Sequence, residues 1–214
     1  MPDRVGELDA AGLPETFFTV WSNVFHGAAI PVDGNFLVHG GAGGIGSTAI
    51  QLGSAFGLNV FTTVASGDEE FVTGLGAKRA IDFREEDFVA ILREAGGADI
   101  ILDIIGGDDV ARNIMASRHD ARIIQLAFNG GSNVALDLMP VMLKRLSYTG
   151  STLRSRPDAF KSAIATELTE TVWPMFSEGK LRPVTHATLP LDQAAEAHKM
   201  MEAASHHGKI LLTP

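Results

Sequence analysis

Short apolar runs alternate along the chain with segments in which apolar side chains recur every three or four residues. Runs of the first kind are typical of buried parallel strands, and segments of the second kind are typical of amphipathic helices. The pattern predicts strands at residues 36–39, 59–64, 79–81, 100–104, 122–127 and 147–152. It predicts helices at residues 45–56, 85–94, 110–117 and 160–178, and a further helix that begins at Pro14. We therefore expect an α/β fold, a doubly wound parallel sheet of the Rossmann type with helices on both faces.

The last part of the chain is organised differently. Two predicted strands, at residues 183–188 and 209–212, flank a single predicted helix at residues 191–204. We expect a dinucleotide-binding domain with an N-terminal helix over residues 1–182 and a separate closing segment over residues 183–214.

Composition narrows the function classes. Hydrophobic residues make up 45% and charged residues 20% of the chain, as in ordinary globular proteins. The net charge of −9 repels nucleic acid and anionic membranes, so neither is expected as a partner. The absence of cysteine excludes disulfides, thiolate zinc sites and a cysteine nucleophile. No apolar run reaches membrane-spanning length and the polar start is unlike a signal peptide, so we expect a cytoplasmic location.

A glycine-rich loop lies between the first predicted strand and the helix after it. Gly41, Gly43 and Gly46 satisfy the spacing G-x-G-x-x-G. In this setting the glycines permit a tight turn, close approach to a pyrophosphate and close packing of helix on strand. The amides of Gly44 and Ile45 are then free to bind phosphate oxygens at the helix start. The alternative is a tight turn with no ligand; a P-loop is excluded because no Gly-Lys-Ser/Thr follows.

The residues after the second strand leave the choice of nucleotide open. An NAD site usually has an acidic residue at that strand end, and residues 62–66 contain none. This favours NADP(H), but no Arg or Lys follows, and Asp68, Glu69 and Glu70 come next. Three carboxylates beside a 2′-phosphate would repel it unless they face solvent. Alternatively they form the acidic first turn of a helix, which we favour.

Other polar and sulfur-containing residues were weighed as site candidates. Tyr148 is the only tyrosine, and Thr152 stands where a short-chain dehydrogenase needs Lys, so that class is excluded. His39 could contact the cofactor, although a structural role is favoured. Asp103 could bind a ligand or cap the next turn. His206 and His207 resemble a zinc pair but lack nearby ligands. Arg154 and Arg156 could lie in the cleft or face solvent. Met139, Met142 and Leu143 are expected to be core or dimer contacts.

At this point the chain resembles the zinc-independent quinone oxidoreductase branch of the medium-chain dehydrogenase/reductase superfamily, and within it the p53-inducible subgroup. The resemblance runs in order over nearly the whole chain. It is carried by LPETFFTVW at 13–21, HGGAGGIG at 39–46, IDFREEDF at 81–88, DIILDIIGG at 99–107, KRL at 144–146, GSTLRSR at 150–156, AHK at 197–199 and GKI at 208–210.

The resemblance implies an NADPH-dependent reductase that transfers hydride to quinones or other conjugated carbonyls without zinc. NADP(H) is the favoured cofactor and NAD(H) is possible. The loop after Ser66 lacks the Lys that family members often use on the 2′-phosphate, and Phe83 replaces a Tyr with a similar contact. The cofactor contacts implied beyond the glycine loop are Ser66, Phe83, Ile104, Ile105, Gly106, Ala127, Phe128 and Asn129. No catalytic residue is assigned.

The resemblance also implies what accompanies this chain in the family. Members begin with a GroES-like catalytic domain of about 100 residues, which is missing here, and residues 183–214 resemble the return into it. We therefore expect nucleotide binding with little or no turnover; the alternative is a non-catalytic dinucleotide-binding module. The stretch Ser147–Leu153 matches the edge strand through which members dimerise, so we expect a homodimer.

Overall fold

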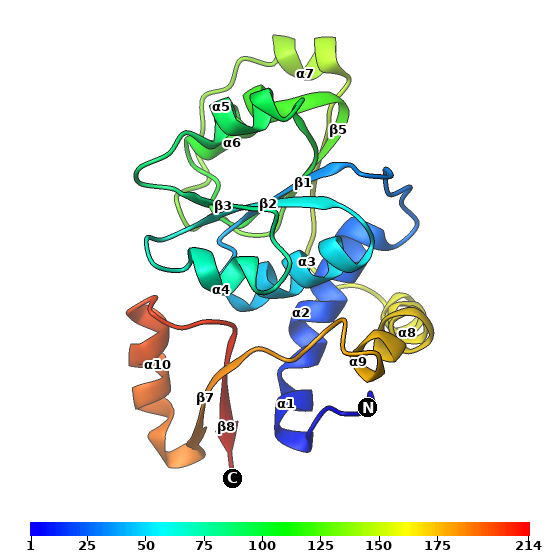
Figure 1. Cartoon of the computed structure of the whole chain (residues 1–214), viewed down its shortest axis with the longest axis vertical. Coiled ribbons are helices and arrows are strands. Elements are labelled where there is room, and N and C mark those ends of the chain that lie inside the picture. The colour runs from blue at the N-terminus through cyan, green and yellow to red at the C-terminus, as the bar shows by residue number, and fades with distance from the viewer.

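The computed structural model describes all 214 residues and is built around a six-stranded parallel sheet (Figure 1). The strand order is β3-β2-β1-β4-β5-β6, with every neighbouring pair parallel. The order reverses between β1 and β4, as in a doubly wound Rossmann sheet, which confirms the predicted fold class. The strands are β1 (Asn35–His39), β2 (Asn59–Val64), β3 (Arg79–Asp82), β4 (Ala98–Asp103), β5 (Ser117–Gln125) and β6 (Ser147–Gly150).

Helices cover both faces of this sheet. One face carries a core of 27 buried residues and the other a core of 11. In Figure 1, α3 and α4 lie on one side of the strands and α5 and α6 on the other. The helices up to β6 are α1 (Glu7–Ala11), α2 (Leu13–Val20), α3 (Gly44–Ala55), α4 (Glu69–Thr73), α5 (Phe88–Glu94), α6 (Asp109–Ala116) and α7 (Met139–Lys144). After β6 follow α8 (Asp158–Glu167) and α9 (Trp173–Ser177), and two π-helical turns, η1 (Trp21–Phe25) and η2 (Leu168–Val172), extend α2 and α8.

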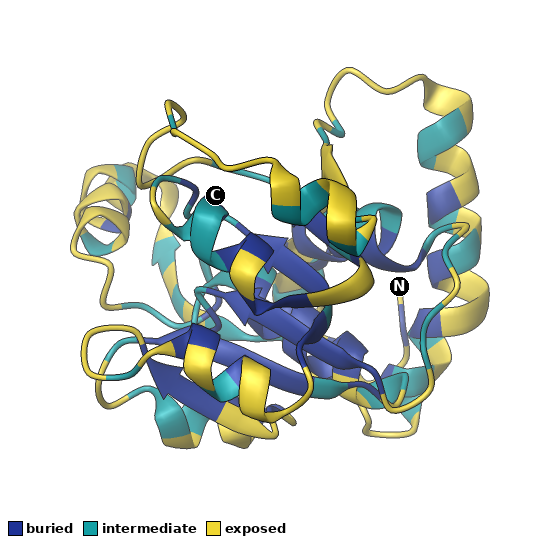
Figure 2. Ribbon diagram, turned by 90° about the horizontal axis from the view of Figure 1, so that it is seen from above, coloured by how far each residue is buried: buried dark blue, intermediate teal, exposed yellow.

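Alternation along the central strands explains how one run of apolar residues serves both cores. In β1, Phe36 and Val38 belong to the larger core and Leu37 to the smaller one, and all three are fully buried. Because successive side chains of a strand point to opposite faces, a strand covered on both sides must be apolar throughout. Figure 2 shows the result, with buried strands enclosed by helices whose outer faces are exposed.

The C-terminal segment forms a second, two-stranded parallel sheet. It consists of β7 (Thr185–Pro190), the short η3 (Leu191–Gln193), α10 (Ala194–Glu202) and β8 (Lys209–Thr213). This unit lies beside α3 and α4 and away from the large sheet (Figure 1). It contacts the glycine loop directly, because the amide of Gly208 donates to the carbonyl of Ala42 at 2.8 Å. A domain boundary at residue 182 remains a prediction.

Several predicted boundaries were wrong. The helix predicted from residue 85 begins at Phe88, since the carboxylate of Asp87 accepts a hydrogen bond from the amide of Val89 at 3.1 Å and caps the helix there. Ile104 lies outside β4, and β6 ends at Gly150 instead of residue 152. The short helices α1 and α7 were not predicted. No helix is long and apolar enough to cross a bilayer.

Candidate dinucleotide-binding site

The loops that follow β1 and β4 meet at the point where the strand order of the large sheet reverses. In open α/β sheets, ligands bind outside the carboxyl ends of the strands at this point. The glycine loop follows β1 and leads into α3, and residues 104–107 follow β4. The topology therefore places the predicted phosphate loop at the position where a Rossmann sheet binds its nucleotide.

The start of α3 offers two unpaired amides. Gly43 is the N-cap residue and has no side chain to cap the helix. The amide of Gly44 faces the carbonyl of Gly208 through the parallel bridge between Gly43 and Gly208, whereas the amides of Ile45 and Gly46 make no hydrogen bond within the protein. The first paired amide after them is that of Ser47, which donates to the carbonyl of Gly43 at 2.9 Å. Free amides at a helix N-terminus, together with the helix dipole, attract an anionic group.

Two of the loop glycines are required by close packing, whereas the third, Gly43, borders open space. A Cβ on Gly46 would lie 2.2 Å from the carbonyl oxygen of Gly40, and one on Gly41 would lie 2.2 Å from the hydroxyl of Thr62. A Cβ on Gly43 would meet nothing nearer than the carbonyl of Gly40 at 3.7 Å. Gly41 and Gly46 thus pack the loop against β2 and α3, while Gly43 leaves the approach to the amides open.

A second wall is formed by the loops after β4 and β5. The amide of Asn129 donates to the carbonyl of Ile104 at 3.3 Å, and that of Gly130 donates to Ile105 at 2.7 Å. Phe128 packs against Gly106, where an added Cβ would lie 2.6 Å from its ring. The structure therefore brings together the predicted residues of these two loops, which are Ile104, Ile105, Gly106, Ala127, Phe128 and Asn129.

A buried chain of polar side chains ties the first wall to the second. His39 lies 3.0 Å from the hydroxyl of Thr63 through Nδ1 and 2.8 Å from Oδ1 of Asn113 through Nε2. The amide nitrogen of Asn113 donates to Asp103 at 2.9 Å. The other oxygen of Asp103 accepts from the amides of Ile105 and Gly106 at 2.6 and 3.0 Å.

These hydrogen bonds decide between the alternatives for His39 and Asp103. Because Asn113 uses its nitrogen on Asp103, its oxygen accepts from Nε2 of His39, and Nδ1 of the ring faces the hydroxyl of Thr63. Both His39 and Asp103 are buried. Asp103 caps the turn after β4, and His39 hydrogen-bonds to the Asn113 side chain that holds Asp103. Both residues therefore have structural roles at this site.

The adenosine end of the site lies at the ends of β2 and β3. Ser66 follows β2 and is exposed, and Phe83 follows β3 with 54% of its surface exposed. The hydroxyl of Ser66 donates to the buried carboxylate of Asp82. This hydroxyl, followed by the amide of Arg84, lowers the pKa of Asp82 below its usual value. The sequence reading missed Asp82, although its position as the last residue of an apolar strand was a signal.

The remaining candidates lie elsewhere. His207 stacks on Phe71 and lies 2.8 Å from Asp68, and the structure holds no group of three His, Asp or Glu side chains arranged for a metal ion. The guanidinium of Arg156 lies over the ring of Phe160 at 4.0 Å, on an exposed loop. Met139, Met142 and Leu143 are 60–69% exposed, so the core alternative for them was wrong.

A family model and several known proteins match the chain. Residues 75–212 match the model described as zinc-binding dehydrogenase. The reducing polyketide synthase FUB1 of Gibberella fujikuroi is 27% identical over 226 residues, which cover 100% of this chain and 9% of that protein. Human quinone oxidoreductase is 25% identical over 217 residues, which cover 99% of this chain and 64% of that protein. The structure of Escherichia coli quinone oxidoreductase complexed with NADPH superposes with a TM-score of 0.85 at 24% identity, over 100% of this chain and 67% of that chain. The chain thus spans less than two thirds of both curated relatives.

Proposed function

The chain belongs to the zinc-binding dehydrogenase family, and we propose that it is the cofactor-binding part of an NAD(P)H-dependent oxidoreductase of the quinone reductase type. The unpaired amides of Ile45 and Gly46 carry this proposal, because they form an open cradle for a diphosphate at the reversal point of the sheet. A bound dinucleotide would supply the hydride for reduction of a quinone or another conjugated carbonyl. The protein contributes position and electrostatics to such a reaction.

The choice of cofactor and the absence of zinc belong to the proposal. NADP(H) is supported by the family resemblance and by the NADPH complex of the Escherichia coli relative. NAD(H) is the alternative, and the residues around the adenosine ribose bear on the choice. Zinc independence is supported by the resemblance to the quinone oxidoreductase branch.

Substitution of Gly43 tests the cradle without unfolding it. Gly43 is an N-cap residue with extended backbone, so Asp or Asn fits there and would cap α3. We expect Gly43→Asp to keep or slightly raise the melting temperature, while its carboxylate fills the cradle and repels the diphosphate. Nucleotide affinity, measured by fluorescence titration with NADH and NADPH, should fall by at least about 30-fold.

Gly43→Asn is the matched control, since it has the same size and caps the helix without the charge. Its loss of affinity should be several times smaller than that of Gly43→Asp. Unchanged affinity in Gly43→Asp would show that the nucleotide, if bound, does not use these amides.

Activity of the whole protein is a further part of the proposal. In the family the substrate lies between this domain and a GroES-like domain, and pockets commonly form between domains. We expect the 214-residue chain to bind the cofactor but to reduce 9,10-phenanthrenequinone slowly or not at all. Turnover at the rate of an intact reductase would show that the cleft is complete in this chain, whereas binding with no turnover in any longer form would favour the non-catalytic binding module.

Partners and location follow from the same proposal. We propose a quinone or enone substrate, no nucleic-acid or membrane partner, a cytoplasmic location and a homodimer through Ser147–Leu153. The homodimer is supported by β6, which lies at the end of the sheet with all four residues exposed. Such an edge is open to pairing with a second copy.

A further inference from the structure

We infer that the adenosine end of this site selects NAD(H) over NADP(H), and that the Ser66–Asp82 pair is the selecting element. The inference rests on the proposed function, because it concerns the same nucleotide site. It also runs against the expectation drawn from the relatives. The two cofactors differ only at the ribose 2′ position, which offers a hydroxyl donor in NAD(H) and a phosphate that needs donors and cations in NADP(H).

The hydroxyl of Ser66 is committed as a donor. A serine hydroxyl has one proton and two acceptor lone pairs. The proton of Ser66 points to the carboxylate of Asp82, so the exposed side of the oxygen can only accept. An acceptor suits the 2′-hydroxyl of NAD(H) and repels the oxygens of a 2′-phosphate. Asp82 thus sets the hydrogen-bonding polarity of a residue that faces the ribose.

Three backbone donors of the same loops are also occupied. The amide of Gly67 donates to the carboxylate of Glu69 at 2.8 Å, and that of Asp68 donates to the carbonyl of Ala65 at 3.2 Å. The amide of Arg84 donates to the second oxygen of Asp82 at 2.9 Å. These donors could otherwise have bound a phosphate, and each is held by an acceptor of the protein itself.

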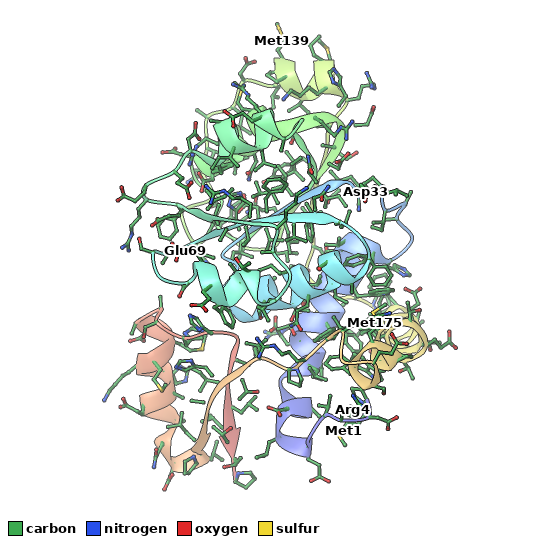
Figure 3. All side chains as sticks on the ribbon, in the orientation of Figure 1. Met1, Arg4, Asp33, Glu69, Met139 and Met175 are labelled. Atoms are coloured by element: carbon green, nitrogen blue, oxygen red, sulfur yellow. The ribbon has the colours of Figure 1, made fainter.

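The charges at this end are mostly negative. Asp82 is the last residue of β3, and Asp68 and Glu69 stand at the start of α4, which follows β2 (Figure 3). Like charges next to a 2′-phosphate reduce its affinity. The nearby cation is Arg84, whose guanidinium lies over the ring of Phe83 at 5.3 Å.

The test is direct titration of the 214-residue chain with NADH and with NADPH, followed by cofactor fluorescence. We expect NADH to bind at least about tenfold more tightly than NADPH. In Asp82→Asn the charge is gone and the Ser66 hydroxyl can turn outward, so the ratio of NADPH affinity to NADH affinity should rise about fivefold or more. In Ser66→Ala the 2′-hydroxyl loses its acceptor, and only NADH affinity should fall.

Asp158→Asn is the control, because it removes the same charge from a fully exposed side chain at the start of α8. It should leave both affinities unchanged. Melting curves without nucleotide show whether Asp82→Asn is folded, and Ser66→Ala provides an independent test if it is not. Equal or tighter binding of NADPH by the unsubstituted chain, lost in Arg84→Ala, would overturn the inference and leave the proposed function intact. No binding of either nucleotide would overturn the proposed function and this inference with it.

Discussion

Asn113 joins the buried histidine and the buried aspartate beneath the site. Its side chain is fully buried on α6, and it accepts from His39 and donates to Asp103. Buried polar groups are tolerated only when they are paired, and a buried carboxylate is the most demanding of them. The position of the turn after β4 therefore depends on one amide side chain.

We expect Asn113→Leu to destabilise the fold by about 2–4 kcal/mol, because it leaves the Nε2 proton of His39 and one oxygen of Asp103 unpaired. The measurement is the free energy of unfolding in urea. Asn133→Leu, at an exposed loop position, is the control and should change it by less than about 0.5 kcal/mol. Equal, small effects of the two substitutions would show that the chain of side chains contributes no stability.

The residues of the site divide into those that local pattern reveals and those that tertiary contacts decide. The spacing of Gly41, Gly43 and Gly46 between a strand and a helix was sufficient to predict a phosphate loop, since each glycine acts through local backbone geometry. The pairing of His39 with Asn113 joins positions 74 residues apart, and spacing carries no information about it. The place of Asp82 at a strand end was a signal, but its pairing with Ser66, 16 residues away, is a tertiary contact.

At the scale of elements, two π-helical turns are joined by one carboxylate. Glu167 lies immediately before η2, and it accepts from the indole nitrogen of Trp21 in η1 at 2.6 Å. Its other oxygen lies 2.9 Å from Nδ1 of His26, directly after η1. The hydrogen bond from Trp21, followed by that from His26, lowers the pKa of Glu167 below its usual 4.5. The N-terminal helix is thereby fastened to the helix that follows β6.

This fastening predicts a pH-dependent effect of Glu167→Gln. Because the pKa of Glu167 is lower in the folded state, the ionised carboxylate contributes stability above the unfolded pKa and loses it as the pH falls through the folded pKa. The side chain is 38% exposed, so we expect only about 1 kcal/mol at pH 7. The difference in unfolding free energy between the two proteins should shrink toward zero below about pH 4.

Urea unfolding at a series of pH values gives the measurement, and Glu170→Gln, an exposed change within η2, is the control. A difference that stayed constant down to pH 3 would mean that the charge of Glu167 contributes nothing and that only its shape matters.

Elements with a regular pattern of apolar residues were predicted, whereas the short helices α1 and α7, which lack such a pattern, were not. The six strands of the large sheet and helices α3, α6 and α8 follow from apolar runs and helical spacing, because burial on one or both faces fixes their pattern. The five-residue α1 has no fully buried residue, and α7 likewise exposes its apolar side chains. Such elements have no buried face that could mark them in the sequence. The start of α5 at Phe88 was not predicted, because it is fixed by the hydrogen bond that Asp87 accepts from the amide of Val89.

At the scale of the whole molecule, the glycine loop lies between two sheets. The large sheet supplies the loop, and Gly208, immediately before β8, holds it by its hydrogen bond to Ala42 and by a parallel bridge to Gly43. Lys209 adds an ion pair with Glu15 of α2 at 3.0 Å. The C-terminal segment therefore holds the glycine loop in place, and the candidate cofactor site depends on residues from both ends of the chain.

The remaining open feature of the molecule is the edge at β6. The helix α7, which precedes β6 in the chain, carries an exposed apolar group that includes Met139, at one end of the long axis (Figure 3). A monomer rarely exposes a flat strand beside an apolar patch, because both invite association.

If the proposed dimer pairs β6 with its copy, a lysine on this strand should prevent it, since the charge opposes edge pairing. We expect the unsubstituted chain to show twice the mass of one chain by light scattering at about 50 μM, within the usual range of specific association, and Thr149→Lys to show the mass of one. Thr188→Lys, the same change on an exposed position of β7, is the matched control and should remain dimeric. A single-chain mass for the unsubstituted protein, or a dimer that survives Thr149→Lys, would exclude β6 as the contact.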